Sequence, residues 1–188
     1  QKEDFTSALP LLENLEQVAY NAENILFAQS NLMKGYYETE AYDSALNFAK
    51  KLLNNNTLSE KVKNDAKVII ARASIKTEDF DTAKLFYENL EEEANGEFKA
   101  ETLYYNAFFK NRNKAYLESN KIIQKVIADY SAYKYWGVKS YVIMAKNYDQ
   151  LNDAYQATFI LENVIKNFTQ FEDIVREAKT ELQKIKEK

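Results

Sequence analysis

Apolar and polar positions follow a helical period along the chain, most clearly from Trp136 to Phe168. On each of two predicted helices the apolar residues share one face: Tyr141, Ala145 and Tyr148 before a polar turn at 151–153, and Ala157, Leu161 and Val164 after it. Small residues stand where two helices would approach closely. The stretch therefore predicts a pair of amphipathic, antiparallel helices.

This helix pair recurs. The small residue of the second helix aligns at Ala45, Ala83, Ser119 and Ala157, with spacings of 38, 36 and 38 residues, and the matching place on the first helix holds Met33, Ala71, Ala107 and Ala145. The alignment predicts four repeats, at 21–54, 58–94, 97–129 and 132–168. A period between about 20 and 50 residues indicates a solenoid, in which stacking of neighbouring repeats supplies the core.

Segments on either side extend the array. Residues 4–19 share eight of sixteen residues with 79–94, which predicts the second helix of a truncated repeat; a free-standing cap is the alternative. Residues 171–187 predict a last helix, either a solvating end helix or the first helix of a further repeat. The whole of 1–188 is then a single array of about ten antiparallel helices.

Composition supports an all-α fold and excludes several functions. Three Gly and one Pro leave little material for β-turns or Gly-rich loops. The absence of His and Cys removes imidazole and thiolate catalysis and the usual zinc sites, and no phosphate-binding loop is present. We expect no enzyme activity, cofactor or metal site. The formal charge of -4 disfavours nucleic acid as a partner, and no apolar run approaches the roughly 20 residues of a transmembrane segment.

The helix pairs resemble the tetratricopeptide repeat. The resemblance covers nearly the whole chain and is most specific in the fourth repeat, where Ala145, Tyr148, Ala157 and Leu161 stand at the signature places. Lys110 and Ser119 in the third repeat depart from the pattern, and the family's Pro after the second helix is missing. The resemblance implies a right-handed α-α superhelix whose first helices line a concave groove that binds a protein or peptide.

Repeats longer than the family's usual length, with a Lys, Asn and Tyr bias, are also similar to large multi-repeat proteins of Bacteroidetes-type bacteria and to envelope tetratricopeptide proteins. This second resemblance implies a fragment of a longer protein in the bacterial periplasm or cell envelope.

The first helices supply the candidate ligand contacts. Projected from their small sites, the open-face residues are Phe27, Ser30, Lys34 and Tyr37; Asp65, Val68, Arg72 and Lys76; Glu101, Tyr104, Phe108 and Arg112; and Lys139, Val142, Lys146 and Asp149. Those predicted to bind are Lys34, Tyr37, Arg72, Lys76, Tyr104, Phe108, Arg112, Lys139 and Lys146. Cations interleaved with aromatic rings suit a peptide with acidic and apolar groups. Ordinary solvated helix positions are the alternative interpretation.

A chaperone-type carboxylate clamp is not predicted, because its places hold Ser30, Lys34, Val68 and Arg72 and its Asn ligands are absent. We expect a non-enzymatic scaffold that binds a peptide or protein segment in the groove. One alternative is a structural spacer or self-assembling module that associates through the apolar faces of 5–18 and 174–185. A weaker alternative is cell-wall glycan binding through aromatic residues, of which Tyr135 and Trp136 are the best placed.

Overall fold

The computed structural model describes residues 5–55 and 58–187, and these residues form ten α-helices and no strand. The helices are α1 (Phe5–Val18), α2 (Ala22–Glu38), α3 (Tyr42–Leu53), α4 (Glu60–Lys76), α5 (Phe80–Leu90), α6 (Gly96–Arg112), α7 (Tyr116–Asp129), α8 (Lys134–Gln150), α9 (Ala154–Asn167) and α10 (Glu172–Lys186). The all-α prediction is confirmed for this part of the chain. Asp4, the first residue of the predicted segment 4–19, lies outside it.

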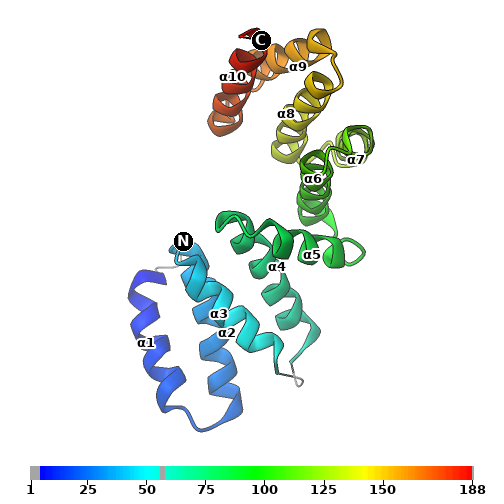
Figure 1. Cartoon of the computed structure of the whole chain (residues 1–188). Helices are drawn as coiled ribbons and strands as arrows, with labels where there is room; N and C mark the ends of the chain where they lie inside the picture. Colours follow the sequence, from blue (N-terminus) through cyan, green and yellow to red (C-terminus); the bar gives the residue numbers. More distant parts are fainter. Residues whose placement is uncertain (1–4, 56–57, 188) are drawn as a thin grey trace. The chain divides into compact units, whose positions relative to one another are not determined.

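The helices belong to two compact units, an N-terminal unit of residues 1–90 and a C-terminal unit of residues 91–188. Within each unit every helix packs against the next one along the chain (Figure 1). Alternate helices also touch: α2 contacts α4 in the N-terminal unit, and α8 contacts both α6 and α10 in the C-terminal unit. Consecutive packing of this kind is that of a helical-repeat protein and is consistent with a solenoid. Among the described helices, none is long and apolar enough to span a membrane.

The turn inside each helix pair has a repeated backbone geometry. Glu40, Glu78, Lys114 and Asn152 have positive φ angles of 62°, 60°, 61° and 63°. Their spacings of 38, 36 and 38 residues equal those of the small residues. The backbone conformation of the turn therefore repeats with the same period as the sequence. After α2 the N–H of Ala41 donates to the Tyr36 carbonyl at 2.8 Å and that of Glu40 donates to Tyr37. These bonds form a Schellman motif, which caps the helix and reverses the chain.

The small residues lie where the helices cross. All eight predicted close-approach positions are fully buried: Met33, Ala71, Ala107 and Ala145 on the first helices, and Ala45, Ala83, Ser119 and Ala157 on the second helices. Except at Met33, the side chains at these positions have one or two heavy atoms, which lets helix axes approach to about 8 Å. That prediction is confirmed.

Each apolar core draws on three consecutive helices. Met33, Leu52 and Ile70 bring α2, α3 and α4 together in the N-terminal unit. In the C-terminal unit α6, α7 and α8 share one cluster, and α8, α9 and α10 share another. A helix pair therefore completes its core only with the next first helix, as expected of stacked repeats.

The left-handed turn residues provide a test of this geometry. We expect Glu78→Gly to raise the free energy of unfolding by roughly 0.5–1 kcal/mol. Glycine removes the steric cost of about 1–2 kcal/mol of a left-handed residue, but it also increases the conformational entropy of the unfolded chain, which offsets part of that gain. Thermal unfolding would measure a rise of about 2–4 °C per kcal/mol. Lys84→Gly, inside α5, is the control and should lower stability by about 1 kcal/mol. Equal losses in both variants would contradict the assigned backbone conformation.

Candidate binding groove

In the N-terminal unit the predicted contacts lie on α2 and α4. Lys34 forms an ion pair with Asp65, with Nζ 2.7 Å from Oδ2. Tyr37 is half-buried and packs edge-on against Tyr42, with ring centroids 5.7 Å apart. Arg72 is half-buried and Lys76 is exposed. Lys34 is thus engaged by the neighbouring first helix.

In the C-terminal unit three first helices, α6, α8 and α10, surround a pocket, which we call the groove pocket. Its volume is about 440 Å³. It is lined by Phe108, Asn111, Arg112, Lys114, Tyr116, Lys146, Asp149, Gln150, Glu181 and Ile185. Three of the residues predicted to bind, Phe108, Arg112 and Lys146, are therefore brought together here. The Arg112 guanidinium lies 5.7 Å from the centroid of the Phe108 ring, close enough for a cation–π contact.

Carboxylates of α10 engage the Lys146 side of this pocket. Lys146 Nζ lies 2.7 Å from Glu177 Oε1 and 3.7 Å from Glu181 Oε1. Lys146 and Glu177 are separated by 31 residues, as are Lys34 and Asp65 in the N-terminal unit. The same ion pair between successive first helices thus occurs in both units. Such partly exposed pairs contribute only about 0–1 kcal/mol each to stability. They do place a carboxylate next to Lys34 and to Lys146.

Tyr104 and Lys139 lie in an aromatic cluster at the start of α8. Lys139 Nζ stands 5.4 Å, 5.3 Å and 5.8 Å from the ring centroids of Tyr104, Tyr135 and Trp136. Tyr104, predicted on the open face, is only 5% exposed because Trp136 packs on its ring. Burial raises the pKa of Tyr104 well above its usual value. Burial and then a hydrogen bond to Asp173 raise the pKa of Tyr135.

Two further open-face candidates are also buried, since Glu101 is 3% exposed and Val142 is fully enclosed. Val142 packs in the cluster shared by α8, α9 and α10. The period of a helix gives the direction of a side chain, whereas the next first helix along the chain decides whether that side chain reaches solvent. Val142 and Tyr104 are therefore core residues rather than surface contacts.

Sequence reasoning also missed members of the groove pocket. Asn111 stands four residues after Ala107, the place that Tyr37 and Asp149 occupy after their own small residues. The α10 wall was missed because no open-face residues were projected onto this last helix, for which an end helix and the first helix of a further repeat were both considered. Aligning Glu177 with Asp65, as the shared separation of 31 residues allows, would have found it.

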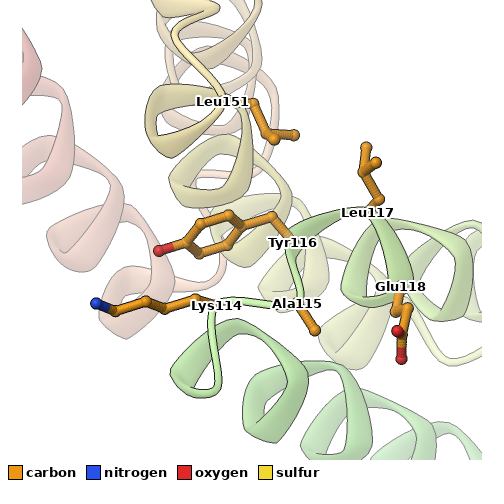
Figure 2. A pocket seen from close by; sticks show the side chains of 6 residues that line it. All are labelled: Lys114, Ala115, Tyr116, Leu117, Glu118 and Leu151. Carbon is orange, nitrogen blue, oxygen red and sulfur yellow. The ribbon is translucent and has the colours of Figure 1, made fainter.

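A second, smaller pocket lies at the turn between α6 and α7. It has a volume of about 290 Å³ and is lined by Lys114, Ala115, Tyr116, Leu117, Glu118 and Leu151. Lys114 and Tyr116 line both pockets, so the two are neighbours. Figure 2 shows Leu117 and Leu151, from different segments, on one side of Tyr116 and Lys114 extending away from them. Leu117 is 66% exposed and Leu151 37%, so both offer apolar surface in this pocket, which we call the annex of the groove pocket.

A buried set of hydrogen bonds, which we call the amide relay, joins α6, α7 and α8 next to the groove pocket. Ser119 Oγ donates to the Ala107 carbonyl at 2.8 Å and accepts from Asn147 Nδ2 at 2.9 Å. Asn147 Nδ2 also donates to Asn120 Oδ1 at 2.7 Å. Asn111 Nδ2 donates to Asn147 Oδ1 at 2.7 Å. The relay explains why Ser119 replaces the alanine of the other repeats: its hydroxyl is both donor and acceptor.

Among residues 5–55 and 58–187, no cluster of three or more acidic side chains is arranged to hold a metal ion. No protein-family model matches the sequence, and a comparison with curated proteins gives no match.

The amide relay should contribute substantially to stability. Asn147 is fully buried, so Asn147→Leu leaves Ser119, Asn120 and Asn111 without their shared partner. We expect the free energy of unfolding to fall by about 2–4 kcal/mol, measured by urea denaturation.

An exposed amide in the same unit is the control: Gln124→Leu on α7 should change stability by less than about 0.5 kcal/mol. Combining Asn147→Leu with Asn120→Leu and Ser119→Ala should recover part of the loss, because two of the three orphaned side chains are then gone. A triple variant no more stable than Asn147→Leu alone would count against the relay.

Proposed function

We propose that this chain is a non-enzymatic interaction scaffold of the tetratricopeptide type, with its repeats wound in a right-handed superhelix. Its C-terminal unit binds a peptide or protein segment on the face formed by α6, α8 and α10. The observation that carries this proposal is the groove pocket, where residues from all three first helices surround one space of about 440 Å³.

The lining of the two pockets defines the ligand. Arg112 and Lys114 are exposed cations at the groove pocket, and Phe108 and Tyr116 provide its aromatic walls. The annex beside Tyr116 combines the apolar side chains of Leu117 and Leu151 with Lys114 and Glu118. A segment that carries an acidic side chain next to an apolar one would meet a cation in the first pocket and Leu117 or Leu151 in the second. Charge-assisted hydrogen bonds and buried apolar contacts are the usual sources of affinity in such grooves.

Capture of peptides from a synthetic library built from Asp, Glu, Leu, Phe, Tyr and Ser tests this proposal. We expect the protein to select sequences with adjacent acidic and apolar residues, with affinities measured by isothermal titration. Arg112→Glu should weaken binding about tenfold or more, because a hydrogen bond to a charged group contributes about 1.5–3 kcal/mol.

Lys121→Glu is the matched control, since it makes the same charge change at an exposed position of α7 that does not line the pocket. Its affinity should stay near that of the wild type. Failure to select any peptide, or equal losses in the two variants, would refute binding in the groove pocket.

Self-assembly is a second candidate function, which the outer face of α1 favours. Leu11 is 74% exposed and Val18 64%, and no described residue of α1 is buried. The other face considered for this role is used internally, because Ile174 and Ala178 of α10 pack against α8 and α9.

Association through α1 predicts a mass that rises with concentration in light scattering. Leu11→Lys combined with Val18→Lys should return the protein to a monomer, because the charges would be desolvated in the interface. A monomeric mass at every concentration would eliminate this candidate.

A further inference from the structure

The orientation of every amide in the relay follows from one main-chain carbonyl. The Ala107 oxygen can only accept, so the Ser119 hydroxyl must donate to it. The Ser119 oxygen then accepts, and Asn147 must present its NH2 group to it. The opposite atom of the Asn147 amide is therefore its carbonyl oxygen, which is an acceptor and faces Asn111. Asn111 must in turn present its own NH2 group to Asn147.

This leaves the carbonyl oxygen of Asn111 for the groove pocket. Asn111 is half-buried and lines that pocket beside Phe108 and Arg112. Among the described residues its Nδ2 has a hydrogen-bond partner and its Oδ1 has none. An amide whose flip is fixed by buried neighbours presents one defined atom to a ligand at little entropic cost.

We propose that Asn111 Oδ1 accepts a hydrogen bond from a main-chain N–H of the peptide that occupies the groove pocket. This inference rests on the proposed function and deepens it, because the hydrogen bonds of the amide relay fix the orientation in which Asn111 Oδ1 faces the main chain of the ligand. The cations beside it recognise the acidic side chain of the same segment, whereas Asn111 recognises a main-chain N–H of the peptide that is free to donate.

An acceptor at this place complements the other polar groups. Arg112, Lys114 and Lys146 can only donate hydrogen bonds when charged, so they recognise carboxylate and carbonyl oxygens. Asp149 and Glu181 are acceptors, but Glu181 already engages Lys146 and Lys184. Asn111 thus supplies a neutral acceptor that does not repel an acidic ligand, which a carboxylate in the same position would do.

The test uses the tightest peptide captured from the acidic–apolar library. Each main-chain amide of that peptide is replaced in turn by an ester, which removes one N–H and leaves the shape almost unchanged. With the wild type we expect one ester position to weaken binding about five- to tenfold, the amount a single hydrogen bond contributes. With Asn111→Leu the same ester should bind as well as the all-amide peptide.

Gln150→Leu is the matched control, because Gln150 lines the groove pocket but is not part of the relay. The ester penalty should persist in it. An ester scan without a sensitive position, or a penalty that survives in Asn111→Leu, overturns the inference and leaves the proposed function intact. If no peptide is captured, the proposed function fails and the inference fails with it.

If Asn111→Leu does not fold, the wild type itself decides the question. The ¹³Cγ resonance of Asn111 should move downfield on binding the all-amide peptide and not on binding the sensitive ester, because only the former donates to the amide oxygen. Equal shifts with both peptides would overturn the inference.

Discussion

The apolar faces of these helices cannot be buried by one helix pair alone, and the rest of the structure depends on that constraint. Four left-handed residues, from Glu40 to Asn152, turn the second helix of each pair back onto the first at a fully buried small residue. The faces that remain are covered only by the next first helix, as the clusters drawn from three consecutive helices show. First helices are thereby brought side by side within each unit, and in the C-terminal unit their common face carries the groove pocket.

The period and the small residues were predictable from the sequence because both are imposed by backbone approach, which hardly depends on neighbours. Ala45 and Ala157 are fully buried, so a larger side chain at either place would have to displace packed neighbours. The site was predictable only in part. Phe108, Arg112 and Lys146 do surround one pocket, but Tyr104 was placed at the surface although Trp136 covers it. Helical period assigns a direction to each side chain, and the covering residue belongs to another helix that the period does not describe.

The charged contacts were also predictable only in part, because ion pairs form between helices that the sequence pattern treats separately. Considered one helix at a time, Lys34 and Lys146 are members of a row of cations that would attract an acidic ligand. Between helices, each meets a carboxylate 31 residues further along the chain. These pairs lower the positive potential of the first-helix faces, so the row of cations is weaker than the sequence pattern indicates. The peptide that we propose as the ligand would then depend also on apolar contacts, for which Leu117 and Leu151 stand beside the groove pocket.

The amide relay places Ser119 where the other repeats have alanine, and burying its polar groups costs free energy unless each atom has a partner. Asn147 meets that requirement with donors to α7 and an acceptor to α6, so its bonds hold only when three helices lie in one register. A sliding error of one helix would leave several buried groups unpaired, which a purely apolar core would not penalise as sharply. The bonds that specify this register are the same bonds that orient Asn111. The geometry of the pocket wall, and with it the position of the acceptor that we propose for the peptide, is therefore tied to correct folding of the core behind it.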